Sequence, residues 1–114
     1  PSMENTLWEG HHYVSWDLGD DDPNKKFNLI TKDQVAKWKE GQILRVYCSM
    51  KDDDAYHQIK LATDWWTDLT SPYEFGEGNV MKFELTQDAL DKMAAEDGFI
   101  CVGHGYYVDK VTIE

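Results

Sequence analysis

The sequence predicts an all-β fold, an antiparallel β-sandwich of the jelly-roll type that carries two short capped helices. Three observations lead to this prediction. Several short segments alternate apolar and polar residues, two segments carry helix-capping sequences, and acidic or Gly-containing loops separate these segments. The 114 residues suffice for one hydrophobic core. Because no linker-like stretch divides the chain, we expect residues 1–114 to form a single domain.

Alternating apolar and polar side chains define the expected strands. In residues 42–50 the apolar side chains fall on one face, and Arg45 and Tyr47 fall on the other. The glycines on either side of His104 indicate a turn that separates the last two strands. The expected strands are 6–9, 27–30, 42–50, 57–62, 80–85, 98–102 and 106–113.

Two segments are expected to be helical because each begins with a capping sequence. Thr31 and Gln34 have the spacing of a capping box, in which each side chain bonds to the other residue's backbone amide. We expect Gly41 to end this helix. The second helix begins after Thr86 and ends at Gly98. Since an apolar strand follows each helix directly, the helices are expected to close two ends or edges of the sandwich.

The charge of the chain excludes two classes of partner. There are 22 Asp and Glu residues against 11 Lys and Arg, which makes the formal net charge −11. Nucleic acids and anionic membranes are bound through clusters of Lys and Arg, so neither is expected as a partner. No apolar run approaches the ~20 residues that span a bilayer. Neutral ligands and ions remain.

Polar side chains on one face of the expected sheet are candidates for ligand contact. If the two strands that contain them are antiparallel neighbours, Arg45 and Tyr47 lie beside Gln58 and Lys60 on the side away from the core. A cation, a phenol, an amide and an ammonium group can together bind sugar hydroxyls and stack on a sugar ring. The alternative is an ordinary solvated face, on which Arg and Lys pair with acidic residues.

The tryptophans supply flat surfaces for stacking, and the chain has five of them. Trp65 and Trp66 are adjacent, so in a strand they point to opposite sides, and the period of two that follows leaves Trp65 as the exposed ring. Trp16 lies in a loop-like context, either as a second stacking residue or as a lid over the core edge. His104 and Tyr106, in the expected turn, complete the candidates at the sheet edge.

The sequence holds no pattern typical of a metal centre, a cofactor or catalysis. The histidines lack metal-ligand spacing, and no cofactor is expected, although the acidic segment 20–24 leaves a structural calcium ion open. Cys48 and Cys101 are expected to be buried, either as free thiols or as a disulfide. No nucleophile motif or phosphate loop is present, so we do not expect an enzyme.

Seven short segments give the chain a recognisable order of strands, caps and glycines. They are LWEG at 7–10, GQILRVY at 41–47, QIKL at 58–61, WTDL at 66–69, FELT at 83–86, GFICVG at 98–103 and VTI at 111–113. In this order the chain resembles the small jelly-roll carbohydrate-binding modules of Bacteroidetes-type glycoside hydrolases and surface glycan-binding proteins.

The resemblance implies a secreted or cell-surface module that binds a neutral plant polysaccharide, such as a β-glucan, a xyloglucan or a mannan, without catalysis. Such a module is tethered to a catalytic domain, whose local concentration at the substrate it raises, and its export signal lies outside this sequence. The alternatives are a protein-docking module of a glycan-utilisation system and a small glycan-active enzyme. The candidate binding residues are Trp65, Trp66, Trp16, Arg45, Tyr47, Gln58, Lys60, His104 and Tyr106.

Overall fold

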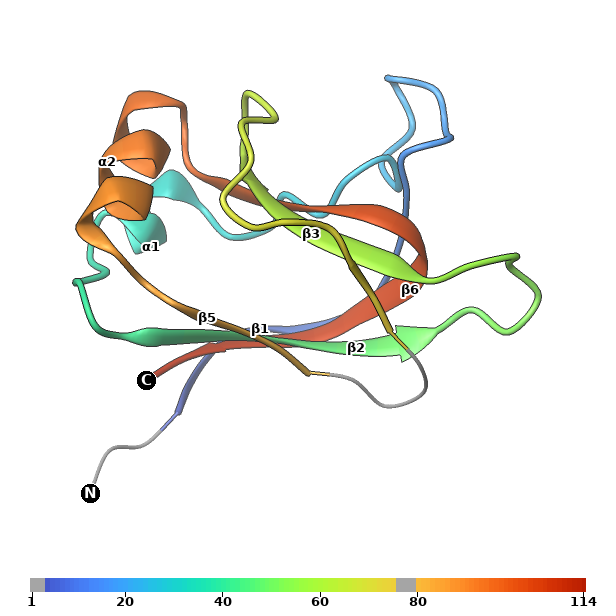
Figure 1. The fold of residues 1–114 in the computed structure, drawn as a ribbon, viewed down its shortest axis with the longest axis horizontal. Helices are drawn as coiled ribbons and strands as arrows, with labels where there is room; N and C mark the ends of the chain where they lie inside the picture. The colour runs from blue at the N-terminus through green and yellow to red at the C-terminus, as the bar shows by residue number, and fades with distance from the viewer. Residues whose placement is uncertain (1–3, 76–79) are drawn as a thin grey trace.

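The computed structural model describes residues 4–75 and 80–114. Its elements are, in chain order, β1 (Asn5–Ser15), α1 (Lys32–Val35), β2 (Ile43–Met50), β3 (Gln58–Thr63), β4 (Tyr73–Glu74), β5 (Val80–Glu84), α2 (Gln87–Ala95) and β6 (Phe99–Ile113). All strand pairs are antiparallel, and the sheet curls over into two facing layers (Figure 1). The predicted fold class, an all-β sandwich with two short capped helices, is confirmed.

Strand β6 organises the sheet because it pairs with three other strands. The strand order is β4-β3-β6-β2-β5, and β1 also pairs with β6. The first part of β6 pairs with β3, from Phe99 to His104, and the second part pairs with β2, from Tyr106 to Ile113. In Figure 1 β6 runs along the upper layer, bends at the right and returns along the lower layer. One strand therefore belongs to both layers.

The prediction of a turn around His104 is wrong, because residues 103–106 lie inside β6. Gly103 and Gly105 have φ angles of 135° and 76°, which L side chains rarely adopt. These two glycines bend the strand while its neighbours continue to pair with it, so the chain changes layer without leaving the sheet. A glycine pair in the sequence does not by itself distinguish such a bend from a turn.

The expected pairing of segments 42–50 and 57–62 is also wrong. Strands β2 and β3 each run antiparallel to β6 and pair with successive parts of it. Segment 27–30 forms no strand, although Phe27 makes an isolated bridge to Cys101. Conversely, β1 extends from Asn5 to Ser15, well beyond the expected 6–9.

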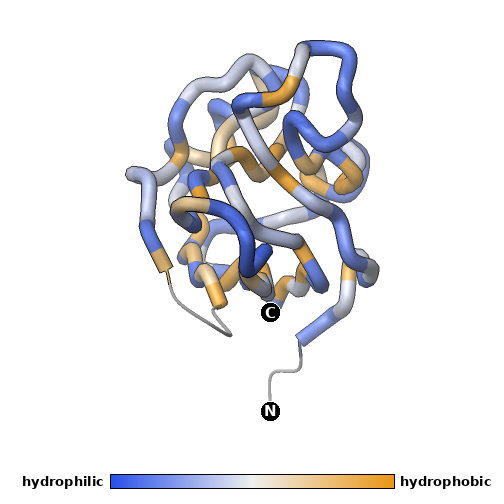
Figure 2. The backbone as a smooth tube through the Cα atoms, turned by 90° about the vertical axis from the view of Figure 1, so that its right-hand side faces the viewer, coloured by the Kyte–Doolittle hydropathy of each residue, from blue (hydrophilic) through white to orange (hydrophobic). Residues whose placement is uncertain are grey.

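The hydrophobic core lies between the two layers. Leu44 and Val46 from β2, Ile59 and Leu61 from β3, and Val108 from β6 are at most 1% exposed. Cys48 and Cys101 are also buried and are free thiols, and burial raises the pKa of both. In Figure 2, which views the end opposite the helices, hydrophilic segments run over the loops and hydrophobic segments lie in the strands between them.

The two helices lie together at one end of the sandwich (Figure 1). The predicted capping box is confirmed, because the Gln34 amide donates to Thr31 Oγ1 at 3.2 Å and the Thr31 amide donates to Gln34 Oε1 at 3.0 Å. Helix α1 ends at Val35, however, so Gly41 does not end it. No helix in the described ranges is long and apolar enough to cross a bilayer.

Helix α2 depends on a single side-chain cap at its start. Thr86 Oγ1 accepts a hydrogen bond from the Ala89 amide at 3.1 Å, and at the other end the Gly98 amide donates to the Met93 carbonyl at 2.8 Å. We expect Thr86→Ala to lower the free energy of unfolding by about 1 kcal/mol, because one amide of the first turn loses its acceptor. Urea unfolding measures the loss. Thr86→Ser, which keeps the hydroxyl, should retain the stability of the parent chain, and equal losses in both variants would contradict the role of the cap.

Candidate functional site

A small group of polar and aromatic residues covers the outer side of β3 and of the first part of β6. Ile59 and Leu61 point into the core, so the alternate residues of β3 point outward. There Ala62, Ile100 and Val102 form an apolar cluster of their own, separate from the main core and fully buried. Two partly buried indoles cover this cluster, those of Trp16 and Trp66. We name this surface the outer aromatic face, which comprises Trp16, Tyr56, Lys60, Trp66 and His104.

Trp66 reaches this face through an unusual backbone conformation. The chain turns directly after β3, where the Trp66 amide donates to the Thr63 carbonyl at 2.9 Å and the Thr63 amide donates to the Thr67 carbonyl at 2.9 Å. Trp66 itself has a φ of 65°, which is rare for a bulky residue and costs roughly 1 kcal/mol or more. The turn places the indole against the outer cluster, so a strained residue is one of the two that cover this cluster.

Trp16 is held in place by a chain of contacts that ends on β6. Its amide donates to the Gly103 carbonyl at 2.7 Å, and its indole N–H donates to the Tyr56 hydroxyl at 3.0 Å. The Tyr56 ring packs on the His104 ring, with centroids 4.5 Å apart. His104 Nδ1 lies 2.8 Å from Ser15 Oγ. The orientation of the indole is therefore fixed by neighbours on three different segments.

Lysines lie beside both indoles. Lys60 Nζ is 5.9 Å from the centroid of the Trp16 ring and pairs with Asp68 at 2.8 Å. Lys25 Nζ is 6.0 Å from the Trp66 ring and donates to the Trp16 carbonyl at 2.7 Å. A surface hollow of about 410 Å³ opens where Lys25 and Trp66 meet. Because these cations already have anionic or carbonyl partners, the face presents polar groups without a large unpaired charge.

The outer aromatic face has the chemistry that a neutral sugar needs. Indole rings supply surfaces on which the C–H face of a pyranose stacks, and ammonium and carboxylate groups beside them bind hydroxyls. The loops around residues 64–66 and 17–24 extend on the same side of the molecule in Figure 1, and the hollow beside Trp66 lies between residues of these loops and the lysines that follow them. The structure brings together four of the expected residues, Trp16, Trp66, Lys60 and His104, with Gln58 opposite His104 in the sheet register.

Trp65 points away from the outer aromatic face, although it lies in the turn after β3 and not in a strand, so alternation along a strand is not the reason. Its side chain is 61% exposed, which confirms the expectation that Trp65 is the exposed ring of the pair. The indole N–H donates to Asp97 Oδ2 at 2.9 Å, beyond the end of α2. This hydrogen bond and the nearby Lys32 ammonium hold the pKa of Asp97 below its usual value. Trp65 is therefore an exposed ring in a fixed orientation.

Arg45 and Tyr47 do not join the outer aromatic face, so their expected grouping with Gln58 and Lys60 is wrong. They lie on β2, which pairs with the other part of β6. Arg45 Nη1 contacts Glu114 Oε1 at 2.7 Å, and the Tyr47 hydroxyl donates to Glu4 Oε2 at 2.6 Å. The Tyr47 hydroxyl lowers the pKa of Glu4, and the Glu4 carboxylate in turn raises the pKa of Tyr47. Arg45 and Tyr47 therefore pair with acidic residues near the two ends of the chain.

Tyr106 is a core residue, which corrects its expected place at the sheet edge. Its side chain is fully buried, and its hydroxyl donates to the Val102 carbonyl at 2.9 Å. Burial raises the pKa of Tyr106 well above its usual value. Sequence reasoning missed Tyr56, which belongs to the outer aromatic face, and Lys25, which lies beside its Trp66 ring. Both lie in charged loops, and only the fold shows that these loops converge.

Within residues 4–75 and 80–114, no three His, Cys, Asp or Glu side chains are placed to hold a metal ion. In the acidic segment 20–24, Asp22 Oδ1 accepts a hydrogen bond from the Asn24 amide at 2.8 Å, and Asp20 lies 3.6 Å from Lys25. These two contacts join residues of the same loop to one another.

A solved structure is similar to this chain over almost its whole length. It is the SGBP-B protein of the mixed-linkage glucan utilization locus of Bacteroides ovatus, in complex with a mixed-linkage heptasaccharide. The similarity covers 99% of this chain with a TM-score of 0.96 and 53% sequence identity. The chain spans 29% of the length of that protein. No protein-family model matches the sequence, and no curated protein does.

Proposed function

We propose that this chain is a non-catalytic glycan-binding module and that its ligand is a β-glucan of the mixed-linkage type. The observation that carries the proposal is the similarity to SGBP-B, which was solved with a mixed-linkage heptasaccharide. At 53% identity over the whole chain, the two share side chains as well as fold. The same comparison gives no support to the alternatives of a protein-docking module or a small enzyme.

The outer aromatic face is the proposed binding surface. Trp16 and Trp66 stack on sugar rings, while Lys60 and Lys25 beside them donate to hydroxyls. A linear glucan is uncharged, which suits a face whose lysines are already paired with aspartates in a chain of net charge −11. Because the face lies at the protein surface, water reaches its rim, and the affinity for one short oligosaccharide should be modest.

The context proposed for the module is a glycan-binding protein at the cell surface. Modules of this kind are expected in glycoside hydrolases and in surface glycan-binding proteins. SGBP-B is a surface glycan-binding protein, so the similarity favours the second of these contexts. Attachment to a catalytic domain stays a prediction. In either setting the module acts by raising the local concentration of whatever is attached to it at the polysaccharide.

Affinity electrophoresis in native gels tests the proposal directly. We expect gels that contain mixed-linkage β-glucan to retard the chain, and gels that contain pectin to leave its mobility unchanged, because the chain and pectin are both anionic. Xyloglucan and glucomannan in parallel gels define the range of neutral ligands, and a reducing-sugar assay on the same polymers should detect no product. Unchanged mobility in mixed-linkage β-glucan would contradict the proposed ligand, and release of reducing sugar would contradict a non-catalytic role.

A further inference from the structure

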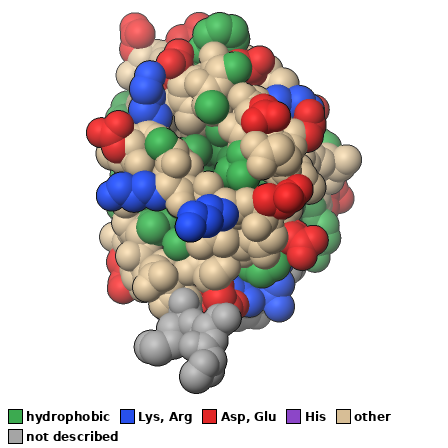
Figure 3. All heavy atoms as spheres, turned by 90° about the vertical axis from the view of Figure 1, so that its left-hand side faces the viewer, with side chains coloured by type: hydrophobic (Ala, Val, Ile, Leu, Met, Phe, Trp, Pro, Cys, Tyr) green, Lys and Arg blue, Asp and Glu red, His purple; other side chains and the backbone are tan. Residues whose placement is uncertain are grey.

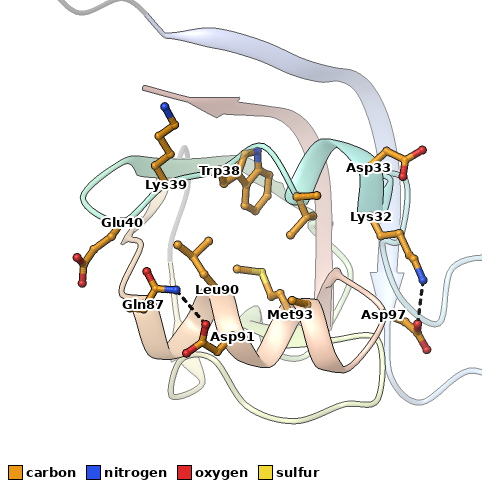
Figure 4. A pocket seen from close by; sticks show the side chains of 13 residues that line it. Lys32, Asp33, Trp38, Lys39, Glu40, Gln87, Leu90, Asp91, Met93 and Asp97 are labelled. Atoms are coloured by element: carbon orange, nitrogen blue, oxygen red, sulfur yellow. Dashed lines mark hydrogen bonds and ion pairs between the residues drawn. The ribbon is translucent and has the colours of Figure 1, made fainter.

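A groove of about 510 Å³ lies between α1 and α2, away from the outer aromatic face. This volume falls within the ~300–1,000 Å³ that is typical of small-ligand sites. Figure 4 shows Lys32 and Asp97 at one end of the groove and Lys39 and Glu40 at the other. In Figure 3, which views the helical end of the molecule, hydrophobic side chains reach the surface among lysines and carboxylates.

The floor of the groove is apolar and largely buried. Trp38 and Met93 point into the gap between the helices (Figure 4) but are only 7% and 1% exposed, and Val35 is 6% exposed. Among the other apolar residues that line the groove, Leu90 is half-buried and Ala94 is exposed. The accessible lining is therefore partly apolar and partly polar, which suits a ligand that carries both C–H and hydroxyl groups.

The rim suits an uncharged ligand that is rich in hydroxyl groups. Lys32 Nζ pairs with Asp97 Oδ1 at 3.2 Å, and the Gln87 side-chain amide donates to Asp91 Oδ1 at 2.9 Å. These groups partly neutralise one another, yet each keeps further donor or acceptor positions, and all four residues line the groove. A charged ligand would meet both signs of charge along this rim. Sugar hydroxyls, which both donate and accept, can bond to either sign.

Trp65 provides an aromatic surface at the Asp97 end of the groove. Its ring is 61% exposed, and its N–H bonds to Asp97, which is itself one of the residues that line the groove. The turn that carries Trp65 is fastened to α2, because Thr63 Oγ1 donates to Glu96 Oε1 at 2.8 Å. The exposed ring is therefore preorganised, so little conformational entropy is lost when a sugar stacks on it.

We propose that Trp65 and the α1–α2 groove form a second glycan subsite, separate from the outer aromatic face. The inference rests on the proposed function, since it takes the ligand to be a neutral glucan. Trp65 and Trp66 are consecutive in one turn, and the first contacts Asp97 at the groove while the second covers the outer cluster, so this turn connects the two surfaces. A long glucan chain can contact both surfaces, whereas a short oligosaccharide occupies one. Simultaneous contact raises the affinity for polymer over that for oligomer.

Two arginine substitutions on α2 test the subsite with a matched control. Ala94 is exposed and lines the groove, whereas Ala95, the next residue, is also exposed and does not line it. Both variants add the same charge and bulk to the same helix. We expect Ala94→Arg to weaken binding to mixed-linkage β-glucan about tenfold, a change that corresponds to one lost aromatic or hydrogen-bonded contact, and Ala95→Arg to bind like the parent chain. Isothermal titration calorimetry measures both.

Each outcome bears on the subsite or on the proposed function separately. If Ala94→Arg binds glucan as the parent chain does while Trp66→Ala loses affinity, the second subsite is overturned and the outer aromatic face stands. If Ala94→Arg alone loses affinity and Trp66→Ala does not, the groove is supported and the outer aromatic face is overturned. If the parent chain binds no glucan, both fail. Trp65→Ala provides a second variant, and an unchanged affinity for the polymer in it would also overturn the subsite.

Discussion

Trp66→Ala should lower the affinity for mixed-linkage β-glucan by at least about tenfold, since a stacked aromatic at the centre of an open site commonly contributes 1.4 kcal/mol or more, roughly a factor of ten. Trp66 lies over the buried outer cluster of Ala62, Ile100 and Val102, with the Lys25 ammonium 6.0 Å from its ring. Alanine removes the stacking surface and leaves the hollow beside Lys25 without its aromatic wall.

The matched control is Trp66→Phe, which keeps an aromatic ring at the same φ of 65°. We expect this variant to retain most of the affinity, since a smaller ring still stacks on a sugar. Isothermal titration calorimetry with the soluble polysaccharide gives both affinities, and urea unfolding verifies that each variant is folded. Equal affinity in the parent chain and in a folded Trp66→Ala variant would remove the outer aromatic face as the binding surface.

Gly103→Ala should destabilise the fold more than any other single change considered for this chain. A Cβ atom at position 103 would lie 1.9 Å from the carbonyl oxygen of Gln58 on the paired strand β3, and the residue has a φ of 135°. Adding ~1–2 kcal/mol for the unfavourable backbone conformation to ~1–3 kcal/mol for the overlap gives a loss of about 2–5 kcal/mol. Chemical unfolding measures the loss.

Gly19→Ala is the control for this substitution. Gly19 is exposed in a loop, and no atom lies within 4 Å of the position that its Cβ would take. This variant should unfold at the denaturant concentration of the parent chain, or slightly above it, because alanine restricts the unfolded chain. If Gly103→Ala were as stable as Gly19→Ala, the bend of β6 would not need glycine, and the account of how one strand serves both layers would be wrong.

Local sequence patterns were sufficient for the elements whose stability is local. The Thr31–Gln34 capping box and the Thr86 cap both form, because a cap is made between residues three positions apart. Strands β2, β3 and β5 lie within a residue or two of their expected bounds, since alternation records which face is buried. Trp65 is exposed as expected, but in a turn after β3 and not through alternation along a strand.

Errors arose where a residue's role depends on partners distant in the sequence. The glycines around His104 have the pattern of a turn, but β1 and β3 on either side of β6 continue the strand through them. The same pattern predicts Tyr106 at the sheet edge, whereas Tyr106 is fully buried. The grouping of Arg45 and Tyr47 with β3 requires that β2 and β3 be neighbours, whereas a third strand separates them.

The sequence by itself determined the fold class, the two helix caps and the tryptophans as stacking candidates. Each of these depends on composition or on neighbours within a few residues. Only the tertiary structure decided which candidates share a surface. The four aromatic residues of the outer aromatic face come from four separate segments; they are Trp16, Tyr56, Trp66 and His104. They meet because β6 bends at two glycines and brings the loops after β1, β2 and β3 to one face. Strand order depends on contacts distant in the sequence, so no local pattern records it.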